Sequence, residues 1–340
     1  MWLYCLKRIL ATIPILIGLT LIVFFIMAMI PGDPAQALLG PWATPENVAR
    51  VKTELGLDKP LYQQYFIWMH NLISGDFGRS FVLNRPVVDE VLERFSATLI
   101  LGGSALLLSS VLGLLAGVLS AIRQFSWSDR FITLAVLLGI SMPSFWIGLL
   151  MIMLFSVQLQ WFPASGMYDI WQGGGLNDLL HHLVLPAVTL SLVATGVIAR
   201  LTRTAMLEVL RLDFIRTARA KGLSEHKVIF RHAFRMALVS VIPVIGIQAG
   251  FVFGGAVYIE TVFQWPGLGA MLVKAVATRD LFLVQGGVLI AAASYVFINL
   301  LADVAQAMLD PRLKSWASQW PLLFSIVIAN RLAHYYWRTV

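Results

Sequence analysis

The feature that most constrains this chain is a series of almost uncharged apolar runs, at about 9–30, 97–122, 132–157, 183–201, 237–262 and 284–309. A helix needs roughly 20 apolar residues to cross about 30 Å of hydrocarbon, and most of these runs reach that length. Hydrophobic residues make up 59% of the 340 residues and charged residues only 13%, more apolar chain than a water-soluble core can bury. We therefore predict an all-α membrane protein with six transmembrane helices.

The apolar runs divide the chain into four parts. Residues 1–30 form a short basic start and a first span whose apolar core is too long for a cleaved signal peptide. Residues 31–96 contain Pro, Gly and charges, which indicates an aqueous segment, and Thr44 followed by Pro45 is typical of a helix start. Residues 97–309 form a core of five further spans, and 310–340 form a tail.

The basic residues predict the orientation, because Lys and Arg concentrate in short cytoplasmic loops. Arg123 and Arg130 flank the connection between the second and third spans, whereas 158–182, between the third and fourth, has no Lys or Arg. The connection between the fourth and fifth spans, 202–236, carries Arg203, Arg211, Arg216, Arg219, Lys221, Lys227, Arg231 and Arg235. This pattern predicts cytoplasmic N- and C-termini and an extracytoplasmic 31–96 segment. It also explains the formal charge of +7 without nucleic acid as a partner.

Small residues recur at helical spacing in two spans. Gly246, Gly250 and Gly254 lie on one face of the fifth span, and Gly113 and Gly117 repeat the spacing in the second. Glycines on one face let another helix approach closely. We predict helix packing at these five positions rather than ligand binding.

Aromatic residues near the predicted outer ends, Trp161, Trp171 and Trp265, fit two interpretations. They could form an interfacial belt, or they could be loop side chains that pack on neighbouring helices.

Reactive groups in the arrangements that enzymes use are missing from the sequence. The chain has no His-Glu-x-x-His, no Gly-x-Ser-x-Gly and no phosphate-binding Gly-x-x-x-x-Gly-Lys-Ser/Thr. His181 and His182 are adjacent but lack a third metal ligand nearby, and the single Cys5 cannot form an intramolecular disulfide. We expect no catalytic residue, no bound metal and no cofactor. The span interiors are also nearly free of ionisable groups, which argues against an ion-coupled transporter.

The basic 202–236 connection is the most informative segment. Ile215, Ala218 and Ala220 provide a small apolar face, Gly222 can take the positive φ that ends a helix, and Ser224 can cap the next one. The pattern predicts two short helices joined at a break. Physical chemistry alone leaves two interpretations open, a topogenic amphipathic segment on the lipid surface or a docking element for a partner.

A family resemblance favours docking. The run Arg216-Thr217-Ala218-Arg219-Ala220-Lys221-Gly222-Leu223 resembles the EAA loop of bacterial ABC importer permeases, in the form of the dipeptide, oligopeptide and nickel branch. Other family markers follow in order: Pro31-Gly32-Asp33-Pro34, Gly56-Leu57-Asp58-Lys59-Pro60-Leu61, Gly75-Asp76-Phe77-Gly78, Met142-Pro143-Ser144-Phe145-Trp146, Leu185-Pro186-Ala187, Phe263-Gln264-Trp265-Pro266-Gly267-Leu268-Gly269, Arg279-Asp280 and Asp310-Pro311-Arg312. The resemblance extends to about Lys314. The chain departs from the family pattern at Arg216, where the general motif has glutamate. It departs again beyond Gly222, at Met236, Val239 and Ser240.

The resemblance implies that a short helix around Gly222 fits a cleft in a separate ATPase subunit. The implied contacts are Thr217, Ala218, Ala220, Gly222, Leu223 and Ser224, with Arg216 and Arg219 at the edges. It also implies a second homologous permease subunit, two ABC ATPase subunits, and an extracytoplasmic solute-binding protein that touches 31–96. ATP hydrolysis would lie on the ATPases.

The expected function is therefore that of a permease subunit, in a bacterial inner membrane, of an ATP-driven importer for di- or oligopeptides. Nickel or another small solute carried by the same mechanism is the nearest alternative. A secondary transporter or channel and a structural membrane scaffold are alternatives from other classes. The sequence does not identify substrate-binding residues.

Overall fold

The computed structural model describes residues 2–29, 34–40, 43–54, 56–80, 82–169 and 174–309. The tail 310–340, Trp171 and the markers at 31–33 and 310–312 lie outside the described residues.

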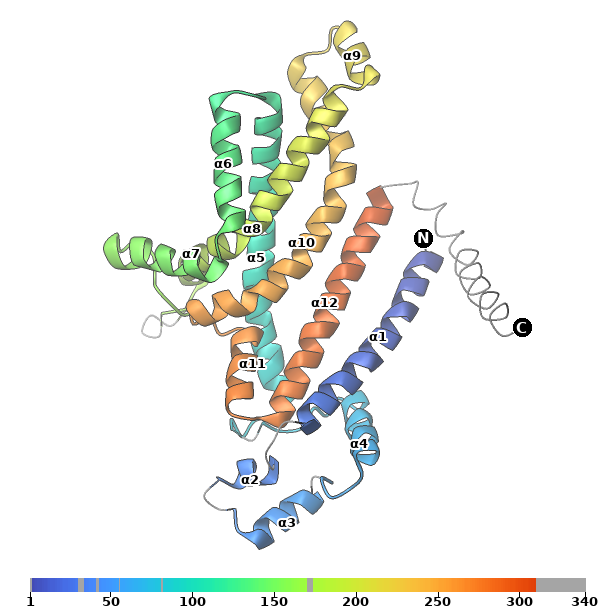
Figure 1. Cartoon of the computed structure of the whole chain (residues 1–340), viewed down its shortest axis with the longest axis vertical. Coiled ribbons are helices and arrows are strands. Elements are labelled where there is room, and N and C mark those ends of the chain that lie inside the picture. The colour runs from blue at the N-terminus through green and yellow to red at the C-terminus, as the bar shows by residue number, and fades with distance from the viewer. Residues whose placement is uncertain are drawn as a thin grey trace, which may run out of the picture.

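Five long apolar helices run along the molecule, and in Figure 1 they lie roughly along its long axis. They are α1 (Trp2–Met29), α5 (Val87–Ile122), α8 (Leu176–Leu210), α10 (Phe234–Val262) and α12 (Leu281–Leu309), and the π-helical segment η3 (Lys227–Ala233) leads directly into α10. Such helices satisfy every backbone polar group internally, as a lipid environment requires. The predicted all-α membrane fold is confirmed, with five spans, or six if one bent pair counts as a span.

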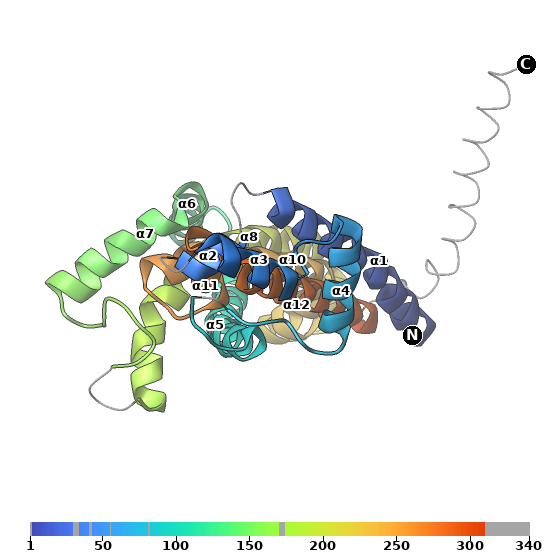
Figure 2. The same cartoon turned by 90° about the horizontal axis from the view of Figure 1, so that it is seen from below.

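The run expected as the third span is that bent pair. It consists of α6 (Trp127–Ser141) and α7 (Ser144–Met151), with α7 continued by the π-helical segment η2 (Ile152–Gln158), and the two parts meet at 107°. Pro143 explains the break, because a proline disfavours helical backbone at the residue before it. Met142 is extended, with φ −94° and ψ 137°. Figure 2 shows α7 pointing away from the other helices. The expected third span is therefore broken into two helical parts, and it is the sixth span if the pair crosses the membrane together.

The 31–96 segment forms three short helices at one end of the long helices, α2 (Pro34–Leu39), α3 (Pro45–Glu54) and α4 (Leu61–Ile73) (Figures 1 and 2). The hydroxyl of Thr44 accepts the backbone N–H of Asn47 at 3.3 Å, so Thr44 caps α3 as predicted. α4 packs on α1, where the rings of Phe24 and Trp68 lie 5.9 Å apart. α5 begins at Val87 rather than near 97.

The most extensive helix contact joins α5 and α8. Two of the predicted packing glycines lie there. A Cβ on Gly113 would be 2.8 Å from the side chain of Ile198, and one on Gly117 would be 2.5 Å from Cβ of Thr202. Glycine is required at both positions because any side chain would push the two helices apart.

The predicted glycine face of α10 is less uniform. A Cβ on Gly250 would lie 2.6 Å from the Tyr295 ring of α12, which is a close helix contact. Gly246 is half-buried on the same helix. A Cβ on Gly254 would meet no atom of the described chain within 4 Å. Tight packing at Gly254 therefore stays a prediction.

Candidate functional site

The candidate site is the loop segment around Gly222, at the end of the long helices opposite α2–α4 (Figure 1). α9 (Asp213–Ala220) precedes it. Gly222 has φ +76°, its N–H donates to the carbonyl of Arg219 at 2.9 Å, and the N–H of Leu223 donates to the carbonyl of Ala218 at 3.4 Å. This pair of bonds is a Schellman motif, which needs a residue with positive φ at the glycine position. The predicted helix end is present at Gly222.

The second arm of the loop begins directly after the break. Ser224 precedes it, and its carbonyl accepts the N–H of Val228 at 3.0 Å. An ion pair across the break, from Nε of Arg219 to Oε1 of Glu225 at 2.7 Å, links the two arms. Both side chains are largely exposed, so the pair orients the arms but contributes little to stability.

The apolar face of α9 points into the chain. Ile215 is fully buried and Ala218 nearly so, and both pack with Met206, Val228 and Ala233 in one apolar cluster. The other predicted contact residues are exposed: Arg216, Thr217, Arg219, Ala220, Gly222, Leu223 and Ser224. Ala218 is thus buried, and its methyl group anchors α9 to the rest of the chain, whereas Thr217, Ala220 and the turn form the exposed surface. A contact of Ala218 with an ATPase stays a prediction.

A buried ion pair links three helices at the point where α5 connects to α6. Asp129 of α6 is buried, and Arg203 of α8 donates to it from Nε at 2.9 Å and from Nη2 at 2.9 Å. The hydroxyl of Ser120 in α5 and the backbone N–H of Phe125 also donate to this carboxylate. Asp129 and Arg203 lie 74 residues apart in the chain, and no local sequence pattern predicts that they meet.

A second buried carboxylate lies at the opposite end, on α10. Glu260 is 0% exposed; its Oε1 accepts from the hydroxyl of Thr98 at 2.6 Å and its Oε2 from the backbone N–H of Ala270 at 3.0 Å. Gly267 allows this approach, because a Cβ there would lie only 2.1 Å from the carboxyl carbon of Glu260. Glu260 thus fastens α10 to α5 and to α11 (Leu268–Ala277). The sequence carries one signal for this site, a single acid near the end of an apolar run that is followed by a Gly-rich turn.

Trp265 supports the packing interpretation of the aromatic residues. It is 1% exposed, and its Nε1–H donates to the carbonyl of Ala97 at 2.9 Å. Trp161 is 59% exposed, and a role in an interfacial belt stays a prediction for it.

The histidine pair is engaged in protein contacts. Nε2 of His181 lies 2.8 Å from the carbonyl oxygen of Trp161, and Nδ1 of His182 lies 3.0 Å from Oδ1 of Asp178. Within the described ranges, no group of three or more His, Cys, Asp or Glu side chains is placed to hold a metal ion.

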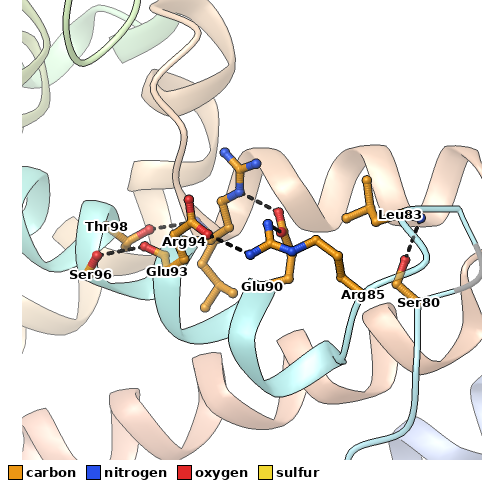
Figure 3. Close-up of polar contacts among 9 residues, drawn as sticks. Ser80, Leu83, Arg85, Glu90, Glu93, Arg94, Ser96 and Thr98 are labelled. Atoms are coloured by element: carbon orange, nitrogen blue, oxygen red, sulfur yellow. Dashed lines mark hydrogen bonds and ion pairs between the residues drawn. The ribbon is translucent and has the colours of Figure 1, made fainter. Parts of the chain in front are cut away.

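Figure 3 shows a charged cluster at the start of α5. Glu90 is 2% exposed, and its two oxygens pair with Nη1 of Arg85 at 3.0 Å and Nε of Arg94 at 2.7 Å. A cavity of about 620 Å³ lies beside this cluster and is also lined by Glu260 and Lys274.

Two family models cover most of the chain. Residues 113–315 match the binding-protein-dependent transport system inner membrane component, and residues 1–102 match the N-terminal part of the same type of component.

Curated relatives are similar along nearly the whole chain. A dipeptide transport system permease protein of Alkalihalophilus pseudofirmus is 38% identical, covering 92% of this chain and 99% of its own. A di/tripeptide transport system permease protein of Pseudomonas aeruginosa is 42% identical, covering 91% and 97%. A glutathione transport system permease protein of Escherichia coli is 40% identical, covering 92% and 98%.

Among solved structures, an inward-facing form of the MetNI methionine ABC transporter matches 65% of this chain and 96% of that chain, with a TM-score of 0.53 and 18% identity. At this identity the match supports the fold alone. The family models and the curated relatives decide the family. The chain belongs to the binding-protein-dependent transport system inner membrane components, and it is a multi-pass inner-membrane permease component of the ABC importer type.

Proposed function

We propose that this chain is the membrane-spanning permease subunit of an ATP-driven importer of di- or oligopeptides. The observation that carries the proposal is the exposed turn around Gly222, held on a buried apolar anchor at one end of the long helices. The rigid anchor and the exposed turn suit a contact that transmits movement from a partner into α8 and α10. The relatives named for dipeptides, di/tripeptides and glutathione support peptides as the substrate class.

The partners follow from this role. Two separate ATPase subunits would bind the turns of this chain and of a second, homologous permease, so that this chain hydrolyses no ATP and needs no cofactor. A solute-binding protein would deliver peptide to the end that carries α2–α4. This arrangement requires the Gly222 turn and both termini on the cytoplasmic side, in agreement with the basic residues of 202–236.

Two alternatives differ from this proposal in measurable ways. An importer for nickel or another small solute would use the same partners with a different cargo. A secondary transporter or channel would move solute without an ATPase. Within the described ranges, the four buried acids all have hydrogen-bond donors and lie at or next to helix ends, which disfavours a proton path through them; they are Glu90, Asp129, Glu260 and Asp280.

The test is reconstitution of the chain with its second permease and two ATPases in liposomes, with the binding protein outside. Uptake of radiolabelled dialanine should require ATP inside, the ATPases and the binding protein. Uptake that persists without the ATPases would contradict the proposal and favour a channel or secondary transporter. ATP-dependent uptake of nickel but not of dialanine would replace the peptide assignment with the metal alternative.

A further inference from the structure

The 620 Å³ cavity at the α2–α4 end has a lining that combines charged and apolar groups. It lies between the start of α5, the end of α10 and α11, and four ionisable side chains line it: Glu90, Arg94, Glu260 and Lys274. Its volume falls in the usual range for small-molecule sites, roughly 300–1,000 Å³.

The acidic groups of the cavity already have their hydrogen-bond donors. Glu90 accepts from Arg85 through one oxygen and from Arg94 through the other. Glu260 accepts from Thr98 and from the backbone of Ala270. All four carboxylate oxygens are thus engaged within the chain, and the two acids are almost fully buried.

The basic groups of the cavity keep unused donors. Arg94 uses only its Nε toward Glu90, and Figure 3 shows its two terminal nitrogens pointing away from that carboxylate. Arg94 is partly buried, and Lys274 is exposed on α11. Neither the Arg94 terminal nitrogens nor the Lys274 ammonium group makes an ion pair or hydrogen bond with any described residue. The cavity therefore has a surplus of charged N–H donors.

Unused donors of this kind suit a carboxylate. A guanidinium group binds a carboxylate through two parallel N–H bonds, and an ammonium group adds a point charge. The remaining wall is largely apolar, with Leu83, Pro266 and Met271 among its residues, and it suits a small side chain next to the bound carboxylate.

We propose that this cavity is a subsite for the C-terminal carboxylate of an imported peptide, with Arg94 and Lys274 as its ligands. The proposal rests on the proposed function for the identity of the ligand. It places a receiving site on the permease itself, at the end where a binding protein would release its cargo.

The experiment uses the assembled permease and ATPase complex in nanodiscs without the binding protein, so that peptide recognition by the latter cannot mask the result. Saturation-transfer NMR measures binding of two probes, trialanine and trialanine amide, which differ only in the free carboxylate. Trialanine should bind saturably to the wild type, and the amide should bind about tenfold more weakly or worse.

The variants identify the ligands. Lys274→Gln should weaken trialanine binding about tenfold and leave the amide unchanged, because the exposed Lys274 makes no contact that folding requires. Arg94→Lys keeps a positive charge beside Glu90 but loses the two-pronged donor, and it should also weaken trialanine selectively. Lys59→Gln, an exposed lysine after α3 that does not line the cavity, is the matched control and should bind both probes as the wild type does.

Three results would overturn the inference. The two probes could bind wild type equally, or Lys274→Gln could retain wild-type affinity. Trialanine could also fail to bind the nanodisc complex although the same complex in liposomes, with binding protein outside, imports dialanine; the proposed function would then stand without this subsite. If Lys274→Gln instead abolished docking of the binding protein and left trialanine binding intact, the cavity would hold an acidic side chain of that protein. If the wild-type assembly showed no ATP-dependent uptake of dialanine, that result would refute the proposed function itself.

Discussion

Replacing Gly222 with valine tests the coupling role most directly. Gly222 has φ +76°, and a Cβ there would meet no described atom within 4 Å. The substitution therefore causes no clash with a neighbour, and its cost lies in the backbone alone. A left-handed conformation costs an ordinary L-residue about 1–2 kcal/mol, and more for a β-branched one. A cost of that size lowers the population of the native turn by a factor of roughly 5–30.

The assay measures peptide uptake and ATP hydrolysis in the same proteoliposomes. Gly222→Val should reduce peptide imported per ATP by at least about fivefold, because the turn seldom adopts the shape that the ATPase contacts. Gly222→Asn is the matched control, since asparagine tolerates positive φ, and it should stay near the wild-type ratio. The melting temperature should change little in either variant, because Gly222 is exposed. A wild-type ratio for valine would refute the reasoning, and an equal defect for asparagine would show that side-chain bulk, not φ, decides.

The remaining predictions concern packing, charge and topology. Gly117→Ala should destabilise the protein by about 1–3 kcal/mol, because its methyl group would force α5 away from α8. Gly103→Ala should not, because a Cβ at Gly103 meets no described atom within 4 Å. Thermal unfolding in detergent compares the two variants, and equal stability would contradict the close contact at Gly117. Asp129→Asn and Arg203→Gln should each destabilise, and a double-mutant cycle should give a coupling energy above about 1 kcal/mol; additive effects would show that the pair contributes nothing. With the native cysteine replaced by serine, Leu223→Cys should react with an impermeant maleimide in inside-out vesicles and not in right-side-out vesicles, and the opposite result would invert the topology.

The long helices could be predicted from the sequence because lipid leaves a spanning segment few choices. A backbone in hydrocarbon must pair its own N–H and C=O groups, so an apolar run of sufficient length becomes a helix whatever its neighbours are. Local chemistry also sufficed for the cap at Thr44 and for the helix end at Gly222, because both depend on residues a few positions apart.

The direction of individual side chains required the tertiary structure. Ala218 and Ala220 are both small and lie in one short helix, yet Ala218 is buried against other helices and Ala220 is exposed. The partner of Arg203 also required the tertiary structure, because Asp129 meets Arg203 only where α6 packs against α8. Arg94 differs, since it pairs with Glu90 four residues earlier in the same helix, a local spacing that favours ion pairs.

The prolines show what local sequence cannot predict, namely which proline breaks a helix. The sequence by itself determined that Pro143, Pro186 and Pro243 each weaken a helix, because each removes a backbone N–H and crowds the preceding turn. Only the tertiary structure decided which of them turns the chain. Pro186 is buried where α8 packs between α5 and α10, and α8 continues through it, as α10 continues through the half-buried Pro243. Pro143 is exposed, and there the two halves of the span separate by 107°. Burial alone does not decide this, because α1 also continues through Pro14, which is exposed. At Pro143 the chain turns because α6 and α7 each pack on α8 in their own direction, and the extended backbone of Met142 allows the turn between them.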